Sequence, residues 1–531
     1  MNIKKLTLSL VLFLTTLIQS QSASAAENIG TTVNEVFSGA TGWFVSFIFA
    51  PIPGTSFPWI VIWLVTGATV FTFYFKFIQF RAAKHAIDLV KGDYADPNDP
   101  GEISHFQALT TALSGTVGLG NIAGVAVAIS IGGPGATFWM VLAGLLGMAS
   151  KFTECTLGVK YRNENADGSV SGGPMHYISK GFAEKGLPGG KILAGFFAVF
   201  CVLSSFGAGN MFQVNQAHAQ ISSITGAYPG WITGIIFAVI IFAVIIGGIK
   251  SIANVSTKVV PFMAVLYVSA ALVILGVNAD KIGWAFTQIF DGAFTGLGVT
   301  GGIVGALIQG FKRAAFSNEA GVGSAAIAHS AVKTNEPVTE GLVSLLEPFI
   351  DTVVICTMTA LVIIISGQLV VDPNTGLYLL GENGHILTAS GSSGVALTSV
   401  AFGQTISWFP YVLAVAVVSF AFSTMLSWSY YGVKAWTYLF GESKKTIMSY
   451  KILYCLLVVV GAAASLGSVI DFSDAAMFAM ALINITALYL LMPVVKKELN
   501  SYMSRLKSGE IKKFAEQPDS DQYLPAKEQL N

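Results

Sequence analysis

Long apolar stretches separated by short polar segments run through almost the whole chain. Between residues 58 and 495 they recur at the length of a membrane-spanning helix, about 20 residues each. The pattern predicts eleven spans, at residues 58–80, 107–132, 136–159, 192–219, 230–248, 253–277, 300–331, 340–367, 403–438, 447–468 and 473–495. It therefore indicates an all-α polytopic membrane protein with about 11 transmembrane helices.

Composition supports this class. Of 531 residues, 53% are hydrophobic and only 11% are charged, whereas a soluble protein carries about 25% charged residues. The 29 basic and 29 acidic residues cancel, so net charge points to no nucleic-acid partner. The 4 cysteines form no C-x-x-C pair and are interpreted as small buried residues.

The N-terminus has the form of a signal peptide, residues 1–26. Lys4 and Lys5 precede an apolar core from Leu6 to Ile18, and Ala23-Ser24-Ala25 resembles a cleavage site. The core is too short to span a bilayer, which disfavours the alternative of a retained anchor. Residues 27–57 contain no Lys or Arg and are predicted to be a periplasmic N-terminal segment.

The distribution of Lys and Arg predicts the orientation. Almost all of them fall in the predicted inner loops, inner helix ends and tail, and Lys281 is the only one in a predicted outer loop. Positive residues remain on the cytoplasmic side. We therefore predict a multi-pass protein of the cell inner membrane, with a periplasmic mature N-terminus and a cytoplasmic tail at residues 496–531.

The spans divide into two halves. With 58–80 set aside as an extra transmembrane helix, five spans occupy residues 107–277 and five occupy residues 300–495. An odd number of spans in each half gives the halves opposite orientations. The sequence thus predicts a 5+5 inverted-repeat core, as in many secondary transporters.

The first span of each half is interrupted. In 107–132, glycines crowd the middle between Gly115 and Gly124, and in 300–331 the polar stretch Phe316–Gly321 breaks the apolar pattern. A broken span is tolerated where its free backbone groups face protein or a polar cavity, and such breaks mark transporter binding sites. An alternative ends the second span at Lys312-Arg313 and leaves Phe316–Gly321 in the cytoplasm.

The first interruption carries the strongest candidate site. Asn121 lies beside Gly118 and Gly120, so unwound carbonyls and an amide oxygen can form a cage for a small hard cation, while half-helix N-termini attract a carboxylate. The same residues match a dinucleotide-binding pattern, but no strand–turn–helix surrounds them. The competing explanation is tight helix packing by small residues.

Two other spans contribute candidate residues. Ser423 and Thr424 place two hydroxyls together in an apolar helix, which suits a cation, and Trp428 shares a face with Thr424. An interfacial aromatic belt is the alternative for Trp428. In the polar patch of residues 209–216, Gln213 is chosen to face the substrate.

Buried acids and histidines leave alternatives open. Glu319, Glu347 and Asp351 lie at membrane depth and either hold structure or relay protons. His218 and His329 lack metal-ligand spacing and are interpreted as structural. No H-E-x-x-H, P-loop or nucleophile-elbow motif occurs in the chain, so the chain is not expected to be an enzyme.

The motifs together resemble those of the alanine or glycine:cation symporter family, also called sodium:alanine symporters. The matching segments, spread from Ile103 to Gly432, are ISHFQALTTALSGTVGLGNIAGVA, GGPGATFWM, GGPMHYISKG, GNMFQVNQ, GGIKSI, FSNEAGVGSA and FSTMLSWSYYG. The resemblance implies a leucine-transporter-like fold. It also implies import of a small neutral amino acid, alanine or glycine, with Na⁺ as coupling ion and no other cofactor.

Site residues follow from the resemblance by position. It places Asn121, Gln213, Phe316 and Trp428 around the substrate, together with the backbone at Gly118 and Gly120. Thr424 lies on the sodium and substrate side, and the sodium site would comprise the backbone carbonyls of Ser114 and Val117 together with Ser423 and Thr424. Leu119 stands where some relatives have Thr, which leaves the choice of amino acid open.

Three other functions remain as alternatives. They are proton coupling through Glu319 or Asp351, a channel and a membrane enzyme.

Overall fold

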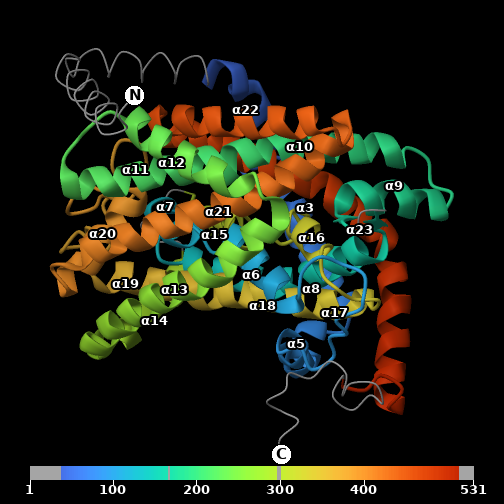
Figure 1. Cartoon of the computed structure of the whole chain (residues 1–531). Coiled ribbons are helices and arrows are strands. Elements are labelled where there is room, and N and C mark those ends of the chain that lie inside the picture. The colour runs from blue at the N-terminus through green and yellow to red at the C-terminus, as the bar shows by residue number, and fades with distance from the viewer. Residues whose placement is uncertain (1–37, 166–167, 296–300, 514–531) are drawn as a thin grey trace, which may run out of the picture.

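The computed structural model describes residues 38–165, 168–295 and 301–513 (Figure 1). The predicted signal peptide and the first part of the predicted periplasmic segment lie outside the described residues. Residues 38–48 are helical, and α3 (Trp59–Tyr74) follows as the first apolar helix within a predicted span.

Helices make up most of the described chain. After α3 they are α4 (Ile78–Arg81), α5 (Ala83–Val90), α6 (His105–Thr116), η1 (Gly120–Gly124), α7 (Val125–Gly132), α8 (Ala136–Lys160), α9 (Pro174–Glu184), α10 (Gly190–Phe206), η2 (Gly207–Met211), α11 (Phe212–Thr225), α12 (Gly230–Ile245), α13 (Gly248–Val277), α14 (Ala279–Thr295), α15 (Gly302–Asn318), α16 (Ala325–His329), α17 (Pro337–Ser344), α18 (Leu346–Pro348), η3 (Phe349–Cys356), α19 (Thr357–Ile365), α20 (Gly394–Thr405), α21 (Phe409–Phe440), α22 (Lys444–Ala463) and α23 (Leu466–Ser508). In the three described ranges the only sheet is the antiparallel pair β1 (Asn163–Glu164) and β2 (Val170–Ser171).

Many of these helices can cross a membrane. Within the described ranges, 7 helical segments are long and apolar enough, and an eighth candidate is the pair His105–Thr116 and Gly120–Gly132, bent by 48°. α3 and α12 are apolar but shorter. Large apolar side chains such as Val239 and Val265, each 66% exposed, cover the outer surface and suit a lipid environment. The polytopic all-α membrane class is confirmed, while the number of eleven spans stays a prediction.

The predicted interruption of the first core span is present. α6 begins at a capping box formed by Ser104 and Gln107 and ends at Thr116, and the chain resumes at Gly120 as η1. The freed N–H groups of Gly118 and Leu119 are bonded by side-chain oxygens of Asn121 (2.8 Å) and Gln213 (3.3 Å). Interior side chains thus replace the helical partners that the unwound backbone lacks.

The second interruption follows α15. Glu319 leaves the helix with φ 56°, and Gly321 (φ 81°) and Gly323 (φ 92°) continue the turn until α16 begins. The left-handed conformation is common for glycine and disfavoured for glutamate, so surrounding contacts must hold Glu319 in place.

The segment around this break lies inside the protein. Every residue from 313 to 332 is buried. Asp474 of α23 pairs with Arg313 and lies 3.3 Å from the Nζ of Lys312. The structure therefore does not support the alternative of a membrane exit at Lys312-Arg313 followed by a cytoplasmic loop.

Wide π-helical turns occur in three spans. η1 follows the first interruption, η2 joins α10 to α11, and η3 joins α18 to α19. Turns of this kind are rare and are frequently found at functional sites.

Four helices lie wholly or mostly in segments between residues 81 and 402 that the sequence pattern assigned to loops. α5, α9, α14 and α20 have 8, 11, 17 and 12 residues. A search for charge-poor runs of membrane length misses them because they are short, and because α14 carries Asp280, Lys281 and Asp291.

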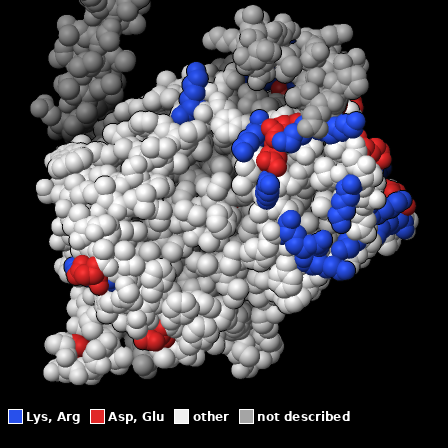
Figure 2. Space-filling view, turned by 90° about the horizontal axis from the view of Figure 1, so that it is seen from below, with Lys and Arg blue, Asp and Glu red and all other residues white. Residues whose placement is uncertain are grey.

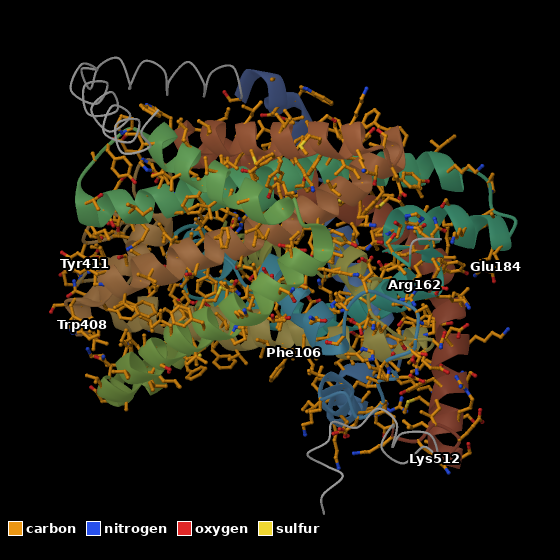
Figure 3. All side chains as sticks on the ribbon, viewed as in Figure 1. Phe106, Arg162, Glu184, Trp408, Tyr411 and Lys512 are labelled. Atoms are coloured by element: carbon orange, nitrogen blue, oxygen red, sulfur yellow. The ribbon has the colours of Figure 1, made fainter. Side chains whose placement is uncertain are left out.

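The two ends of the molecule differ in character. Figure 3 shows Trp408 and Tyr411 at one end, and Arg162 and Glu184 at the other. Trp408 and Tyr411 are 63% and 62% exposed, as expected for aromatics at a membrane–water interface. In Figure 2, most of the visible Lys and Arg residues gather toward the end that carries Arg162 in Figure 3, while much of the surface is uncharged.

Candidate functional site

Asn121 lies in η1 and is fully buried. Its Nδ2 donates to the backbone oxygen of Asp351 in η3 (3.0 Å) and to that residue's carboxylate Oδ1 (2.6 Å). Its Oδ1 accepts the backbone N–H of Gly118 (2.8 Å). The predicted ligand oxygen therefore already holds the broken backbone, and one further lone pair is left for an ion.

The carboxylate of Asp351 joins both interrupted spans. Its Oδ1 accepts from Asn121, and its Oδ2 accepts from Ser317 Oγ of α15 (2.8 Å) and from Thr352 Oγ1 (2.7 Å). All three donors are neutral side chains. From the sequence, Asp351 is expected either to hold structure or to relay protons. Ser317 is not among the candidate residues, and its only signal is its place inside the second interruption.

Gly118, Gln213 and Thr424 converge from three segments of the chain. A Cβ added at Gly118 would collide with Thr424 Oγ1 of α21 and lie 3.5 Å from Gln213 Oε1 of α11. Only glycine lets these side chains approach the unwound backbone so closely.

Thr424 carries an unpaired hydroxyl. The residue is 1% exposed, and its Oγ1 has no hydrogen-bond partner among the described residues. Other buried hydroxyls within the described ranges, such as those of Thr137 and Ser204, are also unpaired, but Thr424 lies against the unwound backbone at Gly118, where its oxygen can bind an ion or a substrate.

The other predicted cation ligands lie where α6 packs against α21. Ser114 Oγ donates to the backbone oxygen of Ser423 (2.7 Å), and Ser423 Oγ donates to the backbone oxygen of Phe420 (3.0 Å). Ser256 of α13, which the sequence analysis missed, donates to Ser114 Oγ (3.2 Å). Val117 is 1% exposed and ends α6 with ψ 89°, which turns its carbonyl out of the helical direction.

Trp428 contacts the second interruption. Its Nε1 donates to Glu319 Oε1 (2.9 Å), and Ser324 Oγ donates to the other carboxylate oxygen. The ring lies directly against Gly209 of η2, where a Cβ would collide with it. At 1% exposure Trp428 is a core residue, so the alternative of an interfacial belt does not apply to it.

Phe316 closes the other side of the unwound segment. Its ring Cδ1 would lie 3.4 Å from a Cβ at Gly120, and its ring meets that of Phe212 edge-on, with centroids 4.9 Å apart. Both aromatics therefore pack close to the first interruption.

Four of the predicted side chains contact the unwound segment, whereas Trp428 contacts Gly209 and Glu319. Contacts join Gly118 to Asn121, Gln213 and Thr424, and Gly120 to Phe316. The side chains are all buried, with Phe316 the most exposed at 6%. Their predicted roles in binding remain predictions.

An ionic cluster lies elsewhere in the core. Lys151 Nζ is 3.2 Å from Glu347, and His329 lies 2.5 Å from Glu340 and 3.4 Å from Glu347. His329 thus makes the ion-pair contacts of a structural residue. Within the described ranges no group of three or more His, Cys, Asp or Glu is arranged to hold a metal ion.

Comparisons with known proteins identify the family of the chain. The profile of the sodium:alanine symporter family matches residues 43–516. The chain is 41% identical over 456 residues to the sodium/alanine symporter AgcS of Methanococcus maripaludis, covering 86% of this chain and 96% of AgcS. It is 32% identical over 446 residues to the amino-acid carrier protein AlsT of Bacillus subtilis, covering 83% and 88% of the two chains.

One solved structure supports the fold. The crystal structure of MhsT in complex with L-phenylalanine superposes with a TM-score of 0.50 at 16% identity, covering 76% of this chain and 99% of MhsT. The leucine-transporter-like fold is thereby confirmed.

Proposed function

Because the chain belongs to the sodium:alanine symporter family, whose members are transporters and not enzymes, we propose that it imports alanine or glycine together with Na⁺. The observation that carries this proposal is the unpaired Thr424 hydroxyl, buried against the unwound backbone at Gly118. Hydroxyl, amide and carbonyl oxygens are ligands that suit an alkali cation.

The cation would be bound between α6 and α21. Thr424 Oγ1 and the turned carbonyl of Val117 would supply two oxygens, and Ser114 and Ser423 would join them by releasing their present bonds. Oxygen ligands of this kind suit Na⁺.

The amino acid would be bound on the other side of the unwound segment. Its carboxylate would face the backbone at Gly118 and Gly120, with Asn121 and Gln213 beside it. Half-helix N-termini stabilise such a carboxylate. Phe316 and Trp428 would enclose the small side chain.

We propose that the protein works by alternating access in the cell inner membrane, with a periplasmic N-terminus and a cytoplasmic C-terminus. The gathering of Lys and Arg toward one end supports this orientation (Figure 2). The burial of the predicted site residues supports a conformation in which the site is closed to both sides.

Proton coupling through Glu319 is the second candidate. The observation that favours it is the bond between Glu319 and Trp428, which places a buried carboxylate beside the proposed pocket.

Uptake into proteoliposomes distinguishes the two candidates. Labelled alanine is offered under an imposed Na⁺ gradient without a pH gradient, and under a pH gradient without Na⁺. We expect concentrative uptake only in the first condition. Concentrative uptake without Na⁺ would contradict sodium coupling and favour Glu319 as the coupling group.

A further inference from the structure

A groove outside the proposed transport site lies between the end of α3 and the last part of α23. Its volume is about 590 Å³, and Lys76, Arg81, Lys496 and Lys507 line it together with Leu499 and Met503. Figure 1 shows that the last part of α23 runs across the direction of α21 and α22. Pro493 lies inside α23 and accounts for this change of direction.

The groove is strongly basic. Among the described residues that line it there is no Asp or Glu. In the part of the chain that the structure describes, none of the four basic residues of the groove forms an ion pair with a carboxylate within 4.0 Å. Lys76, Arg81 and Lys507 are exposed, so their charges are available to a ligand. Four uncompensated positive charges indicate an anionic ligand.

The side chain of Lys496 is held in a defined position in the groove. Its Nζ donates to the backbone oxygen of Tyr74 (3.1 Å) and lies 5.5 Å and 5.7 Å from the ring centroids of Tyr74 and Phe75. These contacts hold the ammonium group in place, unlike a lysine that extends freely into solvent.

Exposed aromatic side chains lie close in sequence to two of the basic residues that line the groove. Phe73, Phe77 and Phe80 are 63%, 42% and 62% exposed on the segment that carries Lys76 and Arg81. Lys76 and Phe77 adopt φ values of 54° and 56°, a left-handed conformation disfavoured for such residues. This backbone strain at a basic and an aromatic residue favours a functional explanation for the turn.

We propose that this groove binds the headgroup of an anionic phospholipid, with the acyl chains against the exposed phenylalanines. A soluble phosphate would use the basic residues but not the exposed phenylalanines of the same segment, and α3 is an apolar helix that ends at this point. Basic pockets between membrane helices recognise such headgroups. The inference does not depend on which substrate the protein carries.

The test is lipid retention by the purified full chain in detergent, measured by native mass spectrometry with dioleoyl-phosphatidylglycerol or dioleoyl-phosphatidylcholine. We expect the unmutated protein to retain phosphatidylglycerol preferentially. Arg81→Gln/Lys507→Gln should weaken that binding by about 10- to 30-fold, since each basic residue near a headgroup contributes about fivefold. Lys84→Gln/Lys497→Gln removes two exposed charges outside the groove lining and should change binding less than about twofold.

A control variant and a soluble ligand complete the experiment. Arg81→Lys/Lys507→Arg preserves both charges and should retain binding, which separates loss of charge from misfolding. Equal retention of the two lipids, or equal weakening by both glutamine double variants, would overturn the proposal. So would glycerol phosphate binding as tightly as phosphatidylglycerol, because the site would then be one for soluble phosphate.

Discussion

Asn121 and Asp351 bond each other through both a side chain and a backbone oxygen, and this pair links the two interrupted spans. Asn121 holds the unwound backbone of the first span at Gly118, and Asp351 accepts from Ser317 in the second. The carboxylate of Asp351 is therefore a direct physical connection between the two interruptions. Coupling of this kind requires a physical connection between elements that have two arrangements.

The first prediction concerns Asn121. Asn121→Ala should abolish sodium-driven alanine uptake, because the N–H of Gly118 and the carboxylate of Asp351 both lose a partner at about 1–3 kcal/mol each. Asn121→Asp should also abolish uptake, since a unit charge about 4 Å away contributes roughly 4 kcal/mol at an effective dielectric near 20. Binding of Na⁺ and alanine to the purified variants is the measurement. Affinities of Asn121→Ala close to those of the unmutated protein would mean that Asn121 only fills space.

The second prediction uses two threonines as a matched pair. Thr424→Val should weaken Na⁺ binding about tenfold or more while leaving thermal stability unchanged, since its hydroxyl has no partner to lose. Thr398→Val should do the reverse and lower stability by about 1 kcal/mol, because Thr398 Oγ1 donates to the backbone oxygen of Ile122 (3.1 Å). An unchanged half-saturating Na⁺ concentration for Thr424→Val would remove Thr424 from the cation site.

The third prediction concerns two glycines of the same interrupted span. Gly118→Ala should reduce stability and uptake because its Cβ collides with Thr424 Oγ1. Gly124→Ala should be tolerated, since nothing lies within 4 Å of its added Cβ. Adding Thr424→Ala to Gly118→Ala should restore thermal stability without restoring Na⁺-dependent uptake. Failure of that double variant to regain stability would contradict the steric explanation.

The fourth prediction separates the two coupling ions at Glu319. Glu319→Gln keeps an oxygen for Trp428 and should therefore retain Na⁺-driven uptake. Trp428→Phe removes the bond and should raise the KM for alanine about tenfold, which corresponds to one hydrogen bond of about 1.4 kcal/mol. Loss of all uptake in a stably folded Glu319→Gln would favour proton coupling.

The fifth prediction concerns the size of the substrate. Phe316 and Trp428 are packed against Phe212 and Gly209, so the pocket cannot widen easily. Each added methylene should then cost about 1–3 kcal/mol, so leucine, with three carbons more than alanine, should compete at least about 100-fold less well than alanine or glycine. Competition assays with unlabelled amino acids provide the measurement. Equal inhibition by leucine would exclude these two aromatics from the pocket.

Much of the fold could be predicted because apolar length and glycine-rich breaks are local signals. The interruption near Gly118 and the break at Glu319 both occur where the pattern indicated. α14 was missed because a short helix with charged residues lacks the apolar length that identifies a span.

The partners within the site could not be predicted in the same way. Nothing in the residues around Asn121 indicates that Asp351, 230 positions away, binds its amide. Likewise, the bond from Trp428 to Glu319 depends on how α21 packs against the second break. Such pairings depend on packing between distant segments, which a single sequence does not encode locally.

The π turns η1, η2 and η3 have a consequence for movement. η1 carries Asn121, η2 supplies Gly209 beneath Trp428, and η3 carries Asp351. A π turn holds one residue more than an α turn, so converting one into the other shifts the following helix by about 1.5 Å and rotates it by about 100°. In such a conversion, each backbone N–H of the turn exchanges its carbonyl partner for the one at the neighbouring residue. The helices that carry η1, η2 and η3 can therefore shift and rotate by one residue at a time around the site while they remain helical.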